Sequence, residues 1–477
     1  MARTFPRYIP KVLKLTEQQK ARVPKGLEIK FGLNRAKQKN GTIYVTERAY
    51  YIDPKTNSPR AIGSVKIGHI PVGSTEIVYD NKAAKSKPVK PDSTSQKVWN
   101  LARETLCDDR RQECVTMDMA SFWIVCLLAS LTGKNTAVHI ADYLSREGKK
   151  LRRLLPGLPD KPVSHDTIRR LMTLLKPEEG LKLAFKLSQP MLGDMSGHVV
   201  SIDGQAVCAS RNEAGRPMFL LNLFDSQAET FLGHLMIDMK KNEYSEAENL
   251  LSHFDIAGTT LTADALFCKR DFIELVLKKG ADYCIPVKDN CKLTKRAIAA
   301  VFDTDFDQAK DFGYEAELDH GRIEQRQVRV LPGRALPQEI LSRWGGLDEG
   351  CIVQCRSSRE DKKSAEVSTQ TRYCITSKRW DEKDIERVIA ETIRYHRRIE
   401  NTLHRNADIV FDQDRIQAKN ASYVNSRTLL NKLALNVISE YRRKTGGNLS
   451  LSRIMEKMRD ATEAEKCLEM VYGSHLS

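Results

Sequence analysis

The run HVVSIDGQAV, residues 198–207, is the most informative stretch for the fold, because the pattern of the chain changes there from helical to strand-like. Two more apolar runs follow it, MFLLNLFDS (218–226) and TFLGHLMIDM (230–239), with turn residues between them. Short apolar runs separated by turn residues are typical of antiparallel strands. The sequence therefore predicts three antiparallel strands from residue 198 onward.

Helical and strand-like runs alternate after these strands. SEAENLLSHFD (245–255) and KRDFIELVLKKG (269–280) predict helices, whereas TTLTADAL (259–266) and DYCIPVK (282–288) predict strands. Strands that lead into such an alternation predict an α/β fold, a mixed sheet with helices on its faces.

The region from about 291 to 380 has a different texture and predicts a β-rich insertion. IEQRQVRVL, CIVQCRSS and TRYCITS are its strand-like runs. Helices resume with DEKDIERVIAETIRYHRRIENTLH (381–404), so the predicted core domain extends over 193–440. Residues 441–477 are expected to form a basic helical tail.

A helical domain is predicted before the core, over residues 98–192. SFWIVCLLASLTG is an apolar helix, and VSHDTIRRLMTLL predicts a short amphipathic helix that presents Arg169 and Arg170. A turn followed by a short basic helix favours a helix-turn-helix that contacts DNA, although many helical bundles have the same pattern.

The first part of the chain carries most of the excess charge. Residues 1–95 hold 19 lysines and arginines against 7 aspartates and glutamates, and the net charge of the whole chain is +15. We expect a small basic β module over 1–79 and a Lys, Pro and Ser-rich linker over 80–97. Such concentrated charge favours a polyanion partner, nucleic acid above all, with a solvated basic tail as the alternative.

Composition excludes several classes of protein. No apolar run approaches the roughly 20 residues that cross a bilayer, and the start MARTFPRYIPKVLKL lacks the apolar core of a secretory signal. We expect a cytoplasmic protein. Eleven cysteines without a CxxC pair indicate reduced, buried thiols, and a metal site built on Cys351, Cys355 and Cys374 is a weak alternative.

Two carboxylates fall at informative places. Asp203 ends the run VVSIDG and Asp264 ends TLTAD, so each is expected near the carboxyl end of a central strand. A carboxylate in an apolar strand needs compensation, and Mg²⁺ takes two or three such ligands. Two ions of this kind can assist phosphoryl displacement. The alternative is a pair of satisfied strand-end or turn residues.

A third carboxylate, Glu400, lies in RYHRRIENTLH (394–404). At α-helical spacing His396, Arg397 and His404 share a broad face with it, which would let cations grip phosphates beside a metal ligand. The full set of expected phosphate contacts around the site is Lys288, Arg394, His396, Arg397, Arg398 and His404. A solvated helix face and a zinc site on His396, Glu400 and His404 are the competing readings. Asp408 is expected either to hold a metal-binding residue in position or to cap a helix at its N-terminus.

The motifs SIDGQAV, KKNEYSEAENLL, TLTADAL, GADYCIPVKDN and YHRRIENTLHRNADIVFDQD occur in this order. The chain thereby resembles the ISAs-type, H-repeat-associated insertion-sequence transposases, a branch of the DDE transposases, from about 98 to 440. It departs from their pattern by Gln205 for Lys, Cys291 for Gln, Arg397 and Arg405 for Trp, and Gln413 for Glu. Any base stacking that depended on the two tryptophans is therefore in doubt.

The resemblance implies an RNase H-like catalytic core interrupted by the β-rich insertion, with Asp203, Asp264 and Glu400 as the metal-binding catalytic triad. It implies Mg²⁺, two ions with Mn²⁺ as a substitute, and DNA as the partner of a homo-oligomer, a dimer on the two element ends. The expected activity is cleavage at the ends by metal-activated water and strand transfer into target DNA, in the nucleoid of a bacterial cytoplasm. The alternatives are a nuclease without strand transfer and a transposase-derived DNA-binding regulator.

Overall fold

The computed structural model describes most of the chain. The described residues are 15–16, 19–20, 23–24, 26–37, 43–54, 56, 58–70, 78–79, 94–110, 115–155, 157–237, 243–304, 308–314, 317–319, 322–361 and 367–473. The chain divides into two compact units, 1–91 and 92–477.

The first unit contains a four-stranded antiparallel sheet. Its strands β1 (Lys30–Lys37), β2 (Ile43–Asp53), β3 (Ser58–Ile70) and β4 (Val78–Tyr79) pair in sequence order. Along β2 the side chains of Val45, Glu47 and Ala49 are buried, and those between them are less so. This alternation is the period of two that places one face of a strand inward.

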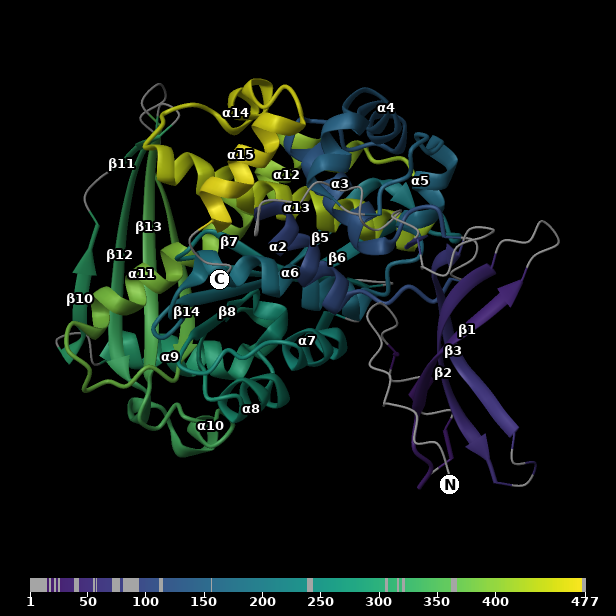
Figure 1. Cartoon of the computed structure of the whole chain (residues 1–477). Coiled ribbons are helices and arrows are strands. Elements are labelled where there is room, and N and C mark those ends of the chain that lie inside the picture. The colour runs from purple at the N-terminus through teal and green to yellow at the C-terminus, as the bar shows by residue number, and fades with distance from the viewer. Residues whose placement is uncertain are drawn as a thin grey trace. The chain divides into compact units, whose positions relative to one another are not determined.

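The centre of the second unit is a mixed sheet. Strands β5 (Val199–Arg211), β6 (Pro217–Asp225) and β7 (Thr230–Ile237) are antiparallel neighbours, and β8 (Thr260–Ala263) and β9 (Asp282–Val287) continue the sheet in parallel on the other side of β5. Helices α7 (Glu243–Ser252) and α8 (Arg270–Lys278) connect β7 to β8 and β8 to β9 (Figure 1). The predicted α/β alternation is therefore present.

The residues predicted as an insertion enlarge the same sheet. Strand β14 (Val367–Thr376) pairs with β9, and β13 (Cys351–Asp361), β12 (Arg322–Pro332) and β10 (Lys310–Gly313) follow outward, with β11 (Glu317–Asp319) also on β12. Helices α9 (Lys292–Thr304) and α10 (Gln338–Leu341) accompany them. Helix α11 (Ile385–Arg398) packs through Ile385 and Ile389 against Val328, Val330 and Val353 of this face.

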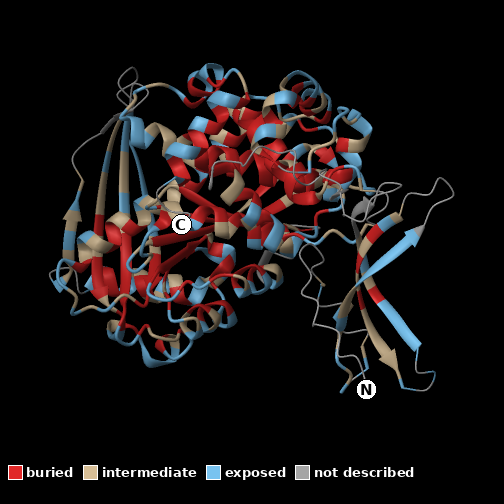
Figure 2. Cartoon of the chain, viewed as in Figure 1, coloured by how far each residue is buried: buried red, intermediate tan, exposed pale blue. Residues whose placement is uncertain are grey.

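The helical part is built from both ends of the second unit. The N-terminal helices are α2 (Thr94–Thr105), α3 (Met119–Leu131), α4 (Ala137–Leu154), α5 (His165–Met172) and α6 (Pro177–Leu192), and the C-terminal ones are α13 (Ala421–Thr445), α14 (Leu451–Lys457) and α15 (Ala461–Tyr472). They share one apolar core, in which every residue of α3 is buried (Figure 2). Apolar helices of this kind are stable only when other helices surround them.

Three expected boundaries differ from the structure. Residues 94–97 of the expected linker begin α2, and the remainder, 80–93, lies outside the described residues. The expected C-terminal tail is packed: the amide of Ser95 donates to a carboxylate oxygen of Glu465 in α15, at 3.2 Å. Ten residues, 155–164, connect α4 to α5, whereas a helix-turn-helix has a turn of three or four. Within the described part of the chain, none of the helices is both long and apolar enough to cross a membrane.

Candidate active site

Asp203 and Asp264 lie next to each other across two parallel strands. The last paired residues of β5 and β8 are Ile202 and Ala263, and each aspartate is the next residue along its strand. Asp264 stands at the carboxyl end of β8, as expected, but Asp203 is internal to β5, because β5 continues to Arg211 in its pairing with β6. Because β8 ends at Ala263, β5 is no longer paired with β8 from Asp203 onward.

The carboxylate of Asp264 is half-exposed and already has polar partners. It accepts a hydrogen bond from the amide of Ala265 at 2.8 Å, and the Lys288 ammonium lies 3.1 Å from the same oxygen. Burial alone would raise the pKa of Asp264, but these two donors lower it below its ordinary value. The expected strand-end lysine therefore faces a site carboxylate.

The carboxylate of Asp203 faces His404. The two side chains are 3.7 Å apart, His404 Nδ1 to Asp203 Oδ2, and the other ring nitrogen of His404 is 3.2 Å from the Asn222 amide. The Asn222 oxygen in turn accepts a hydrogen bond from the fully buried ammonium of Lys432. A chain of polar contacts therefore runs from α13 through β6 to Asp203.

Asn222 and Lys432 are the site residues that the sequence did not reveal. Each is a polar residue in an apolar run, FLLNLFD on β6 and LLNKLALNV on α13. Burial lowers the pKa of Lys432 to about 7, partly offset by Asp408. A buried lysine in an apolar helix signals a specific partner, but only the fold identifies that partner as Asn222.

Glu400 occupies a different environment. It lies in a π-helical segment, η7 (Ile399–His404), in which the amide of Arg405 donates to the carbonyl of Glu400. The segment lies against β5, yet the Glu400 side chain is exposed. Among the described residues, no three His, Cys, Asp or Glu side chains are grouped to hold a metal ion. The structure brings Asp203 and Asp264 together and leaves Glu400 at the surface nearby.

The π-helical segment also overturns the expected helix face. A π-helix has a longer repeat than an α-helix, so side chains four residues apart no longer share one direction. His396 and His404 are largely inside, where His396 contacts the Thr262 hydroxyl at 3.1 Å. Burial lowers the pKa of His396 to about 4 and that of His404 to about 3. A neutral histidine cannot serve as a cationic phosphate contact. Because His396, Glu400 and His404 do not share one helix face, the zinc site considered for them is not formed among these described residues either.

Arg397 joins a cluster of arginines from the insertion strands, which we call the arginine cluster: Arg326, Arg359, Arg372 and Arg397. Glu324 pairs with Arg326 at 2.5 Å and with Arg359 at 2.7 Å. Burial and the neighbouring arginines lower the pKa of Arg397. The cluster therefore carries an excess of positive charge, and its member Arg397 lies three residues before Glu400 in the sequence.

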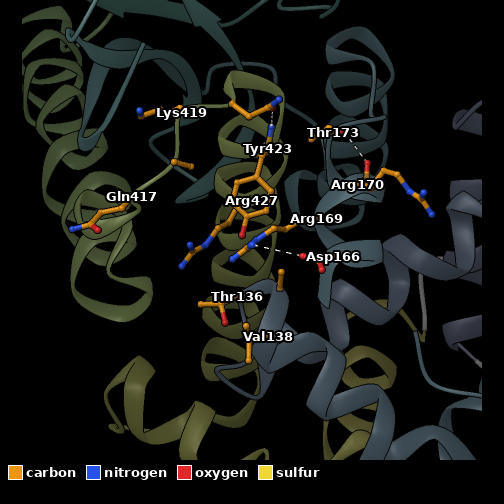
Figure 3. A pocket seen from close by; sticks show the side chains of 13 residues that line it. Thr136, Val138, Asp166, Arg169, Arg170, Thr173, Gln417, Lys419, Tyr423 and Arg427 are labelled. Carbon is orange, nitrogen blue, oxygen red and sulfur yellow. Dashed lines mark hydrogen bonds and ion pairs between the residues drawn. The ribbon is translucent and has the colours of Figure 1, made fainter. Parts of the chain in front are cut away.

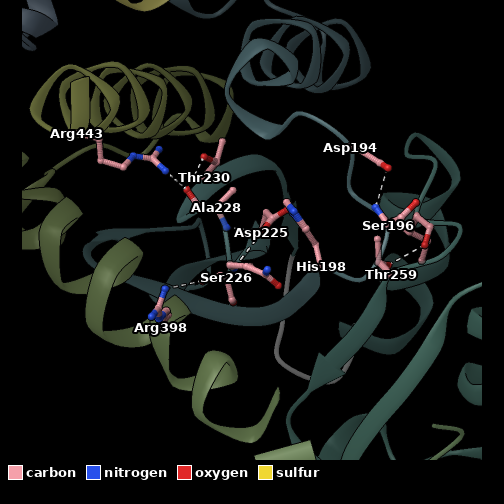
Figure 4. Close-up of polar contacts among 12 residues, drawn as sticks. Asp194, Ser196, His198, Asp225, Ser226, Ala228, Thr230, Thr259, Arg398 and Arg443 are labelled. Atoms are coloured by element: carbon pink, nitrogen blue, oxygen red, sulfur yellow. Dashed lines mark hydrogen bonds and ion pairs between the residues drawn. The ribbon is translucent and has the colours of Figure 1, made fainter. Parts of the chain in front are cut away.

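The other arginines of α11 have structural contacts. Arg398 donates to the carbonyl of Ser226 at 3.3 Å, pairs with Glu229 at 3.1 Å and lies over the ring of Tyr395 (Figure 4). Arg398 thereby connects α11 to the turn between β6 and β7. At the same turn, Asp225 Oδ2 lies 2.7 Å from His198 Nδ1. Arg394 is exposed and lies over the ring of Tyr314. Arg398, which we expected to contact phosphate, thus already has three partners within the protein.

Arg169 and Arg170 are far from these carboxylates in the sequence and line a separate cavity with residues of α4 and α13 (Figure 3). Both are exposed on α5.

Two smaller expectations are also decided. Asp408 lies inside α12 (Arg405–Phe411) and is not an N-cap; its carboxylate is 3.5 Å from the Gln205 amide, and burial raises its pKa to about 6. The cysteines that the structure describes are free thiols, and burial raises the pKa of Cys284 and Cys351.

Comparison with known proteins agrees with this architecture. Residues 196–437, half of the chain, match the family described as "Transposase DDE domain". The chain is similar to "Putative transposase YncI" of Escherichia coli O157:H7, with 27% identity over 71% of this chain and 87% of that protein. It is similar to "H repeat-associated putative transposase YhhI" of Escherichia coli K12, with 27% identity over 66% and 82%. An uncharacterized protein in the dhlA 3′ region of Xanthobacter autotrophicus is 30% identical over 53% of this chain and 85% of its own length.

The chain therefore belongs to the insertion-sequence family of DDE transposases, and the resemblance seen in its motifs is confirmed. Membership in this family implies DNA as a partner and a divalent metal ion in the reaction.

Proposed function

We propose that this chain is a transposase with an RNase H-like core that cuts phosphodiester bonds at the ends of a mobile element and joins the freed 3′ ends to target DNA. The observation that carries the proposal is the adjacency of Asp203 and Asp264 on parallel strands in a chain of the DDE family. The strand order β7-β6-β5-β8-β9 supports the RNase H-like assignment of the core.

The residues present fit a hard divalent cation. Asp203 and Asp264 offer carboxylate oxygens, the donors that Mg²⁺ prefers, and both side chains are partly open to solvent. We propose Mg²⁺, two ions with Mn²⁺ as a substitute, and Glu400 as the third ligand, contributed by a segment that already lies against β5. Metal ions bound there would supply the positive charge that assists in-line displacement at phosphorus.

The remaining residues prepare the site. In this proposal His404, itself in contact with Asn222, positions the Asp203 carboxylate. Arg398 positions α11, and with it the following segment that carries Glu400. The arginine cluster and Arg394 would bind phosphates of the strand that approaches the carboxylates, because guanidinium groups bind phosphate in a bidentate manner. Joining two ends requires two sites, so we propose a dimer on DNA, with the basic unit 1–91 as a further DNA contact.

Glu400→Gln tests the catalytic assignment. Because the Glu400 side chain is exposed, the substitution should not disturb folding. The variant should lose Mg²⁺-dependent cleavage of a duplex carrying the DNA that flanks the gene. It should still bind that duplex as the wild type does. Glu248→Gln, an exposed glutamate of α7, is the matched control and should cleave normally. Cleavage by the Glu400 variant at the wild-type rate would remove Glu400 from the triad.

Two further assays separate the alternatives. Pre-cleaved ends that the wild type cannot join to a target plasmid would indicate a nuclease. A biological effect that survives Asp203→Ala would indicate a DNA-binding regulator.

A further inference from the structure

A cavity of 620 Å³ lies on the helical part of the second unit, where four segments meet. Its wall is formed by the start of α4, the exposed side of α5, the loop 417–420 and the first turns of α13 (Figure 3). Residues far apart in the sequence thus form one concave surface.

The lining is strongly cationic. Four cations, Arg169, Arg170, Lys419 and Arg427, line it together with one carboxylate, Asp166, which is 3.8 Å from Arg169. Among the described residues, no carboxylate pairs with Arg170 or Lys419, and both are exposed. The cavity therefore has unneutralised positive charge on both of its sides.

Arg427 adds a polar group that lacks a partner. Its side chain is largely buried, and within the described residues its Nε atom has no hydrogen-bond acceptor. Burial lowers the pKa of Arg427, which the Tyr423 hydroxyl and Asp412 offset only in part. The Nε atom is itself closed to solvent, so Arg427 contributes its positive charge to the cavity.

Two helices also begin at the cavity. Thr136 caps α4 and Asn420 caps α13, each through a side-chain oxygen that accepts an amide of its first turn. The positive ends of both helix dipoles therefore add to the charge of the side chains. Most of the lining residues carry a charged or polar group, although apolar carbon makes up most of the exposed surface of the cavity.

We propose that this cavity seats the backbone of duplex DNA, with Arg170 and Lys419, on its opposite sides, contacting two separate phosphates and Arg427 adding positive charge. The proposal rests on the proposed function in that it assumes a DNA partner, and it places a second contact on the helical part, apart from the carboxylates. It also gives Arg169 and Arg170 a role without a helix-turn-helix: α5 forms one wall of a phosphate seat.

The test is the salt dependence of binding. The full chain, in EDTA so that no cleavage occurs, is titrated against a labelled duplex of arbitrary sequence over a series of KCl concentrations. Removing two phosphate contacts should lower the slope of log K against log salt by about 1.8, because each contact contributes about 0.9. We expect this loss for the double variant Arg170→Gln with Lys419→Gln.

The matched control removes the same charge from the other end of α4. Lys149→Gln with Arg153→Gln changes two exposed residues about 18 and 24 Å along the helix from Ala137, at about 1.5 Å per residue. It should leave the slope at the wild-type value. Equal slopes for the two double variants would overturn the proposal.

Three outcomes identify the source of the bound anion and separate this proposal from the proposed function. If inorganic phosphate raises the Tm of the wild type but not of the Arg170 and Lys419 variant, while duplex binding is unchanged, the cavity binds a free anion and the DNA assignment is wrong. If the wild type cleaves flanking DNA but the slope is unaffected, the cavity proposal fails and the transposase stands. If the slope falls in the double variant but the wild type never cleaves, the cavity proposal stands and the proposed transposase activity fails.

Discussion

Replacing Arg397 by glutamine should stabilise the free protein and weaken its binding to DNA. Arg397 lies in the last turn of α11 beside Arg326, Arg359 and Arg372, and Glu324 is the carboxylate among them. Glu324 already bridges Arg326 and Arg359, so the charge of Arg397 meets mainly like charges. Arginine does not lose its proton near neutral pH, so the repulsion persists in the folded state.

The size of the effect is estimated from the surface range, because Arg359 and Arg372 are exposed while Arg326 and Arg397 are only partly buried. Like-charge neighbours on a surface cost about 0.2–0.5 kcal/mol each, and two or three such pairs give about 0.5–1 kcal/mol. Because a change of 1 kcal/mol moves the Tm of a large domain by about 2 °C, the Arg397→Gln variant should melt about 1–2 °C higher. The loss of one phosphate contact should lower the salt slope of DNA binding by about 0.9.

Both quantities can be measured on the full chain, by differential scanning calorimetry and by duplex titration at several salt concentrations. Arg356→Gln is the matched control, because Arg356 is exposed on β13 an odd number of residues from Arg359 and therefore on the opposite face. It should change neither the Tm nor the slope. A lower Tm for Arg397→Gln, or a slope equal to that of the control, would refute the charge-cluster reasoning.

Two more predictions concern single carboxylates. Burial raises the pKa of Glu465 from 4.5 to about 7, so the folded state binds the proton more tightly than the unfolded state; stability should fall as the pH rises between these values. The Glu465→Gln variant should lack this pH dependence and be more stable than the wild type by about 2 kcal/mol at about pH 8. Thermal unfolding at several pH values measures the difference. Stability profiles of the variant and the wild type that run parallel with pH would contradict the prediction. Lys288→Gln should strengthen Mn²⁺ binding to the full chain about two- to fivefold in calorimetric titration, since the ammonium 3.1 Å from Asp264 competes with a cation; weaker binding would contradict this.

The order of the elements was predictable because it depends on local patterns. The observed strands β5, β8 and β9 fall on the runs around Asp203, Asp264 and Asp282, and the helices α7 and α8 fall on the amphipathic runs before and after β8. The strand-like runs of the insertion correspond to β12, β13 and β14. Apolar spacing and turn residues act over a few positions, so they can be read from the sequence alone.

The surroundings of the candidate site were less predictable. The π-helical segment at 399–404 adds a residue to a helix turn, and nothing in IENTLH marks it. The expected face of His396, Glu400 and His404 assumed an α-helical repeat, so it failed there. Likewise, the contact of Lys432 with Asn222 joins residues 210 positions apart, and no local pattern carries that information.

Local patterns were enough to identify the α/β alternation, the transposase motifs and the aspartates that follow two apolar strand runs. The folded chain was needed to show that Asp203 and Asp264 are neighbours in register, that residues 94–105 and 461–472 belong to one helical core, and that α5 and α13 line a cationic cavity. The difference lies in the range of the interactions. Strand and helix propensities act between near neighbours, whereas burial and charge depend on residues that meet only when the chain has folded.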